Sequence, residues 1–277
     1  MQVRRSCYYS WRVAASYGLS TVKTSQAARV KECFYFHRRR YGSRRIAAEL
    51  QIGRFRARSV MKRMGLRAIA PKRFKPQTTD SKPGHPVSRN LLQNGMNAPA
   101  GRGEVFVGDI TYVPLVGGGF CYLACLQDKF TRRIVSWKVA RQMTAQFVID
   151  VFLQARRRGL MGKGAIIHTD RGSQYASVDY RRLLYIGGFR QSMSRRGNCY
   201  DNAQAESFFS RFKAELVENG IFESVEQAES EVFSYIEGYY NRIRLHSSLG
   251  YLSPMEFEKQ LEIKNQRSRE SFVSCKT

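Results

Sequence analysis

Acidic residues are scarce in this sequence, and the shortage is greatest in its first hundred positions. The 277 residues include 22 Asp and Glu against 47 Lys and Arg, for a formal net charge of +25. Residues 1–100 contain 3 of these acids and 22 of the basic residues. A merely solubilising surface does not explain so uneven a distribution, which indicates a polyanionic partner and a basic DNA-binding module in this part of the chain.

Long apolar runs and ordered cysteine patterns are missing as well. No stretch reaches the roughly 20 apolar residues that cross a membrane, and none follows the basic N-terminal residues as in a signal peptide. The spacing of the six cysteines fits neither a disulfide framework nor a paired Cys/His zinc site, so a reducing cytoplasm is expected. Two of them, Cys121 and Cys125, lie in an apolar segment and are predicted to be core residues.

Proline is rare outside one segment. Five of the seven prolines fall within residues 70–102, together with scattered Gly and Ser. This composition predicts an extended linker. The linker carries four basic side chains that could lie along DNA, namely Lys72, Arg73, Lys75 and Lys82.

Residues 25–66, before this linker, favour helices. Apolar residues recur at helical spacing in Ser43–Leu50, with Ser43 as the predicted N-cap, and Gly53 separates this helix from Phe55–Met64. The second helix carries the basic residues Arg54, Arg56, Arg58, Lys62 and Arg63. Two short helices around a glycine, the second one basic, favour a DNA-binding helix-turn-helix, and a small helical bundle with a solvated basic face is the alternative.

The rest of the chain predicts a mixed α/β sheet. Apolar and β-branched runs indicate strands over residues 105–113, 120–130, 134–139, 165–169 and 189–193. Helices are expected over residues 144–158, 177–186 and 224–240, and around Glu206. We expect the tail after Lys259 to be mostly exposed and poorly ordered. Strands followed by alternating helices and strands are typical of an α/β domain.

Three carboxylates stand out in this part of the chain. Asp109 interrupts an apolar strand, Asp170 ends the next apolar run before a glycine, and Glu206 lies among helix formers. A carboxylate inside an apolar strand is costly unless something pairs with it. Three carboxylates brought together would repel one another, and Mg²⁺ is the hard cation that carboxylates and phosphates share. The pattern therefore predicts a magnesium site.

The spacing of these acids leads to a resemblance. Asp170 and Glu206 are separated by 35 residues, and Lys213 follows Glu206 by seven, two turns along the same helix face. Matching text surrounds them in order: residues 108–112, 168–175, 192–206, 240–242 and 245–251. The chain resembles the catalytic core of retroviral integrases and, within that group, the second-frame transposases of copy-out/paste-in insertion sequences.

The resemblance implies a ribonuclease H-like fold and a DNA transposase of a bacterial insertion sequence, nucleoid-associated in the cytoplasm. Asp109, Asp170 and Glu206 would be the catalytic acids and would hold two Mg²⁺ ions, for which Mn²⁺ may substitute. The DNA partners would be the element's terminal inverted repeats and target DNA, bound by a homo-oligomer. An upstream-frame protein is a further implied partner. A metal-dependent nuclease of the same fold and a non-catalytic protein that binds element ends remain alternatives.

Several neighbours have weaker indications. Lys213, Arg195, Arg196, Arg242 and Arg244 are candidates for phosphate contacts, with a solvated surface as the alternative. His168 shares a strand face with Asp170, and we expect it to be structural because Mg²⁺ seldom takes imidazole. Asn198 and Asn202 match family positions and are expected to support the site.

Three further acids are expected to play other parts. Asp201 is the main rival of Glu206 as the third acid, and either it or Asn202 is expected to cap the helix that carries Glu206. Asp128 and Asp179 lie in polar surroundings and are expected at the surface.

These expectations divide the chain into five parts. Residues 1–69 would form the helical DNA-binding domain and 70–102 the linker. Residues 103–218 would form the ribonuclease H-like core, 219–262 a C-terminal helical extension and 263–277 the tail.

Overall fold

The computed structural model describes residues 5, 8, 9, 21–71, 86–195, 202–217 and 222–274. The chain divides into two compact units, Met1–Ile69 and Ala70–Thr277. Among the described residues, no helix combines the length and the apolar character needed to cross a membrane.

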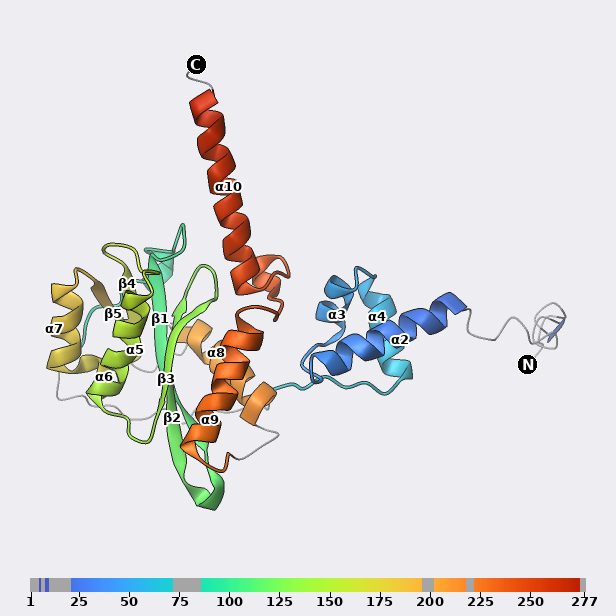
Figure 1. Cartoon of the computed structure of the whole chain (residues 1–277), viewed down its shortest axis with the longest axis horizontal. Helices are drawn as coiled ribbons and strands as arrows, with labels where there is room; N and C mark the ends of the chain where they lie inside the picture. The colour runs from blue at the N-terminus through green and yellow to red at the C-terminus, as the bar shows by residue number, and fades with distance from the viewer. Residues whose placement is uncertain are drawn as a thin grey trace. The chain divides into compact units, whose positions relative to one another are not determined.

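The first unit is helical. It contains α2 (Thr21–Phe36), α3 (Ser43–Glu49) and α4 (Arg54–Arg63), and its core includes Val30, Phe34, Ile46, Ala57 and Met61 (Figure 1). The helices expected within residues 25–66 are therefore present. The predicted N-cap is wrong by one residue, because Gly42 occupies that position and Ser43 already belongs to α3. A short turn joins α3 to α4, as in a helix-turn-helix.

The second unit is built on a five-stranded mixed sheet with the strand order β3-β2-β1-β4-β5 (Figure 1). Strands β1 to β3 are antiparallel neighbours, whereas β4 and β5 run parallel to β1. The strands are β1 (Val105–Pro114), β2 (Phe120–Asp128), β3 (Ile134–Ala140), β4 (Ile166–Thr169) and β5 (Arg190–Met193). Their positions agree with the expected strands to within two residues at each end.

Helices cover both faces of this sheet. On one face, α5 (Ala145–Arg157), α6 (Ser173–Ala176) and α7 (Val178–Ile186) pack on Phe106, Leu126 and Ile167. On the other face, the helical segments pack on Val113, Leu123 and Trp137. These segments are α8 (Ala203–Phe212), the π-helical η4 (Lys213–Val217), α9 (Val225–Phe233) and the π-helical η5 (Ser234–Tyr240). The architecture is a mixed α/β sheet, as the periodicity predicted, and ribonuclease H-like, as the resemblance implied.

Among the described residues, the remaining elements are three 3₁₀ turns and one long helix. The turns are η1 (Gln93–Gly95), η2 (Val116–Gly118) and η6 (Ser247–Leu249). The chain then forms α10 (Pro254–Ser274). The tail after Lys259 is expected to be exposed and poorly ordered; residues 262–268 are exposed as expected, but the chain is helical up to Ser274, and residues 275–277 lie outside the described residues. Glu, Lys, Gln and Arg are strong helix formers, so this segment can be helical without a continuous apolar stripe.

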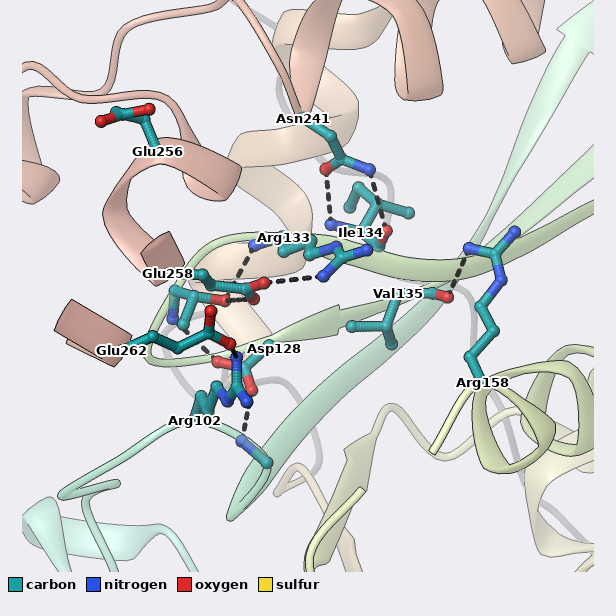
Figure 2. A network of polar contacts seen from close by, with 12 residues as sticks. Arg102, Asp128, Arg133, Ile134, Val135, Arg158, Asn241, Glu256, Glu258 and Glu262 are labelled. Atoms are coloured by element: carbon teal, nitrogen blue, oxygen red, sulfur yellow. Dashed lines mark hydrogen bonds and ion pairs between the residues drawn. The ribbon is translucent and has the colours of Figure 1, made fainter. Parts of the chain in front are cut away.

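A polar network fastens the start of α10 and the end of η5 to the sheet (Figure 2). Glu258 accepts hydrogen bonds from the Arg133 guanidinium at 2.6 Å and from the Thr131 hydroxyl at 3.0 Å. Fully buried Asn241 bonds to both the N–H and the C=O of Ile134 at 3.0 Å. Asn241, one of the residues that carry the resemblance, is thus a structural clamp on β3.

Asp128 corrects another expectation. It is 2% exposed rather than a surface residue. Its carboxylate accepts backbone N–H bonds from Gly103 at 2.6 Å and from Phe130 and Thr131 at 2.8 Å. Three such bonds offset the loss of hydration and close the β2–β3 turn, so the role of Asp128 is structural. Asp179, in contrast, is exposed on α7 as expected.

Candidate active site

The sheet brings Asp109 and Asp170 together. Parallel strands β1 and β4 pair Val107 with His168, so two residues further along Asp109 lies across from Asp170, just beyond the end of β4. Alternation along β1 places Asp109 on the same face as Val113, which packs in the cluster that includes α8. Both carboxylates therefore point toward the helix that carries Glu206.

Close backbone packing allows this approach. A Cβ on Gly108 would lie 3.2 Å from Cγ2 of Thr169 and 3.4 Å from Cδ1 of Leu126, which is tighter than ordinary contact. Gly172 donates its N–H to Asp170 Oδ1 at 3.0 Å and orients that carboxylate in the turn after β4. A Cβ on Gly172 would also lie 3.1 Å from Asp170 Oδ1, so space favours glycine near each aspartate.

Side chains of the first turn of α8 position Glu206. Asn202 stands at the N-cap but makes no side-chain capping bond, and Asp201, the other expected cap, lies outside the described residues. Its Nδ2 atom instead donates to the Gly108 carbonyl at 3.5 Å, and Gln204 donates to the Gln127 amide oxygen at 2.9 Å. Buried phenylalanines anchor the rest of the helix, namely Phe208, Phe209 and Phe212. These contacts hold α8 against β1 and β2 and leave Glu206 exposed beside Asp109.

The three acids interact electrostatically. Burial is the largest influence, and together with the charges of Asp170 and Glu206 it raises the pKa of the Asp109 carboxyl well above its usual range. The Ile110 N–H, 2.8 Å from Asp109 Oδ1, and the Lys213 charge oppose this rise. Desolvation also raises the pKa of Asp170 and of Glu206. Burial, and at Asp109 also the neighbouring acids, therefore makes the ionised form of these carboxyls costly in the protein alone.

Lys213 follows α8 and lies within electrostatic reach of these acids. It is the first residue of η4 and is exposed. Desolvation, the larger effect, lowers the pKa of Lys213, whereas the Asp109 charge raises it. The seven-residue offset from Glu206 thus places a cation beside the carboxylates.

His168 lies beneath the acids as a buried structural residue. It is fully buried, with Nδ1 2.8 Å from the Ser192 hydroxyl and Nε2 3.2 Å from the Ser194 hydroxyl. Both hydroxyls come from β5 or its end, so the imidazole links β4 to β5. The Arg171 guanidinium reinforces this link, because its Nε donates to the Ser194 carbonyl at 2.8 Å.

The candidate phosphate contacts divide into separate groups. Arg195 and Arg242 are exposed. Arg244 is 2% exposed and pairs with buried Glu215 through bonds of 2.7 and 3.0 Å. Its expected phosphate contact is therefore wrong, because the guanidinium is already used inside the fold. Arg196, Asn198 and Asp201 lie outside the described residues, as do the linker residues Lys72, Arg73, Lys75 and Lys82.

Helix α4 in the first unit presents a basic surface. Ala57, Val60 and Met61 face the core. All five basic side chains singled out in the sequence are exposed, and they are Arg54, Arg56, Arg58, Lys62 and Arg63. Phe55 is 84% exposed among them, a feature that its apolar character did not predict. The helix contains no acid to neutralise this surface.

The sheet order and the acids on β1, after β4 and on α8 define an integrase-like class of ribonuclease H-like protein. The integrase core domain family matches residues 99–199, and a second integrase core domain family matches residues 206–261. The chain is 41% identical over 236 residues to the transposase of insertion sequence element IS904 from Lactococcus lactis, covering 83% of this chain and 92% of that protein. It is 38% identical over 271 residues to the transposase InsF of IS3A from Escherichia coli, covering 94% and 92%.

A solved structure is also similar, the HTLV-2 integrase catalytic core domain in complex with magnesium. The TM-score is 0.43 and the identity 13%, over 56% of this chain and 96% of that one. The identities to IS904 and IS3A over most of the chain establish the relationship. The protein belongs to the family of IS3-type insertion-sequence transposases.

Proposed function

We propose that this transposase cleaves DNA strands at the ends of its insertion sequence, transfers the freed 3′ ends and integrates the element into target DNA. The observation that supports the proposal is the meeting of Asp109, Asp170 and Glu206 at the junction of β1, β4 and α8. Carboxylates that repel one another at a solvent-accessible position are costly for folding and are typical of functional sites.

The acids fit a divalent cation. Their donors are carboxylate oxygens only, which suit Mg²⁺ and also Mn²⁺. Burial, followed by the charges of Asp170 and Glu206, raises the pKa of Asp109, and a bound cation would stabilise the ionised carboxylate against these effects. We therefore assign Asp109, Asp170 and Glu206 as the ligands of two Mg²⁺ ions. When bound, these ions neutralise phosphate charge and lower the pKa of the attacking hydroxyl or water.

The chain's own residues would orient the reacting strand. Asp109 is fixed on the most central strand, and Asp170 is held by the Gly172 N–H. Lys213 is placed to hold a DNA phosphate beside the scissile bond through its charge. Asn202 acts through Glu206 by fastening α8 to β1, so it is a positioning residue. Asn198 and the arginines 195 and 196 are proposed to support the same DNA segment.

The first unit would recognise the element's ends. We propose that α4 enters the major groove, with its five basic residues and Phe55 facing DNA. Most of the affinity would come from phosphate contacts, since these residues are basic and exposed. Synapsis of two ends and a target requires more than one copy, so a homo-oligomer on DNA is proposed, with an upstream-frame protein as a possible partner. The reaction would take place on bacterial DNA in the cytoplasm.

Cleavage of labelled element-end DNA by the full chain in Mg²⁺ tests the catalytic assignment. Asp109→Asn, Asp170→Asn and Glu206→Gln should each reduce strand cleavage and joining by at least about 10³-fold, while binding to the ends remains. Asp179→Asn and Glu229→Gln are matched controls because both acids are exposed on helices away from the three carboxylates. A folded variant with full cleavage would overturn the assignment.

The products distinguish the alternative activities. A transposase joins a pre-cut 3′ end to a second duplex and breaks one target strand, so a labelled end strand becomes longer than it was before joining. A nuclease of the same fold gives cleavage alone, and an end-binding protein gives neither product. Joining that depends on all three acids supports the proposed function.

A further inference from the structure

The first unit contains a second cluster of ligating side chains, in addition to the acids of the sheet. Cys33 lies on α2, His37 follows one helical turn later, and Glu49 ends α3. The Cys33 sulfur, a ring nitrogen of His37 and a carboxylate oxygen of Glu49 all lie within 4.8 Å of one another. Cys33 and His37 are 6% and 1% exposed, so the cluster is built into the interior of the unit.

The surrounding contacts orient these groups. His37 Nε2 lies 2.8 Å from one oxygen of Glu49 and 3.0 Å from the other. The Tyr41 ring stacks on the imidazole with a centroid distance of 3.6 Å and an interplanar angle of 8°. The Cys33 thiol also hydrogen-bonds to Glu49, and burial followed by the Glu49 charge raises the pKa of that thiol to about 12. The Glu49 carboxylate therefore contacts both the Cys33 thiol and the His37 imidazole.

We propose that Cys33, His37 and Glu49 bind one Zn²⁺ ion. Sulfur, imidazole nitrogen and carboxylate oxygen are the three donor types that zinc accepts, whereas Mg²⁺ seldom takes the first two. The Glu49 side chain is 33% exposed, which leaves a path for entry and a fourth position for water. On binding, the thiol loses its proton to solvent and the cation replaces the direct His37–Glu49 contact.

The ion would cross-link two helices. Cys33 and His37 belong to α2 and the turn after it, whereas Glu49 closes α3, the first helix of the proposed helix-turn-helix. Zinc would therefore stabilise the unit that presents α4. This inference does not depend on strand transfer, because it concerns different residues and a different metal.

Cobalt substitution in the full chain gives a direct test. Excess Mg²⁺ is added first to occupy the acids of the sheet, and Co²⁺ is then titrated in. Thiolate ligation should produce a near-ultraviolet charge-transfer band that equimolar Zn²⁺ abolishes. Cys33→Ser should lose this band. Cys125→Ala should keep it, which controls for the buried thiol close to Asp109.

Zinc content and unfolding complete the experiment. After dialysis against Zn²⁺ and then buffer, wild-type protein should retain one zinc per chain and melt at a higher temperature than EDTA-treated protein. Glu49→Gln can still hydrogen-bond to His37 and should lose both effects. If Cys33→Ser does not fold, Glu49→Gln serves as the test variant in its place. An ordinary His37–Glu49 ion pair predicts no cobalt band and no retained zinc in the wild type, and either result overturns the proposal.

Discussion

Asn202, at the start of α8, donates a hydrogen bond from Nδ2 to the carbonyl oxygen of Gly108 at 3.5 Å. Gly108 directly precedes Asp109, so this bond ties the helix of one candidate acid to the strand of another. The bond is buried and spans 94 positions of sequence. The relative placement of Asp109 and Glu206 therefore depends on one amide side chain as well as on core packing.

Asn202→Ala should slow strand cleavage by about 10- to 100-fold, because small displacements of reacting groups carry penalties of this size. Affinity for element-end DNA should stay within about twofold, since Asn202 is buried. Single-turnover cleavage with saturating DNA measures the effect. Ser207→Ala, exposed on the same helix, is the control. Equal rates for the two variants would remove Asn202 from the positioning network.

Asp109→Asn should stabilise the metal-free fold. The unfolded carboxyl ionises near pH ~4, whereas folding raises the pKa of Asp109, so between these values the folded state binds more protons. Stability contributed by this group therefore falls as pH rises through that window. In EDTA at neutral pH the variant should melt a few degrees higher, on the order expected for a 1–2 kcal/mol change. The difference should vanish below about pH 4.

Mg²⁺ provides the complementary measurement for this variant. Because a ligand stabilises the state that binds it, Mg²⁺ should raise the melting temperature of the wild type more than that of Asp109→Asn. Asp179→Asn, which alters an exposed acid, should behave like the wild type throughout. A lower melting temperature for Asp109→Asn in EDTA would contradict the inferred cost of ionising the buried Asp109 beside the other acids.

Lys213→Ala should weaken joining of a pre-cut element end by about 10-fold or more without altering the Mg²⁺ concentration needed for half-maximal activity. Its charge lies near Asp109 but contributes no metal ligand. Lys213→Arg should keep much of the activity because a positive charge within reach is the main requirement. Arg211→Ala tests whether any exposed cation at this end of α8 has the same effect. Unchanged joining by Lys213→Ala would indicate that Lys213 is an ordinary exposed lysine with no role in joining.

Arg56→Ala should reduce affinity for element ends and lower the slope of log affinity against log salt by about one, the loss of one phosphate contact. If Arg56 contacts a base instead, the slope should persist while discrimination against random duplex falls. Filter binding or fluorescence anisotropy across salt concentrations separates these outcomes. Arg182→Ala, an exposed arginine on α7, is the control. Equal binding by both variants would count against α4 as the recognition helix.

Local patterns predicted most of the secondary structure. The β-branched and aromatic run around Asp109, the apolar run before Asp170 and the helix expected over residues 144–158 each depend on neighbours within a few positions, and each element appears at its expected place. The 35-residue spacing also indicated which acids belong together. The sequence did not predict the burial of polar side chains whose hydrogen-bond partners are distant in the chain. Asp128 is satisfied by Gly103, and Arg244 by Glu215, 29 positions away.

The sequence by itself determined the strands, the helices and the basic character of the first unit. These follow from residue type and short-range periodicity, which are present before the chain folds. The choice of the three candidate acids came from the 35-residue spacing and the resemblance that it led to. The tertiary structure decided which polar side chains are buried and paired inside the fold and which remain available at the candidate site. It joined Asn202 to Gly108, buried Asp128 and Arg244, and gathered Cys33, His37 and Glu49. Such pairings depend on how elements pack across the chain, and no local pattern encodes that packing.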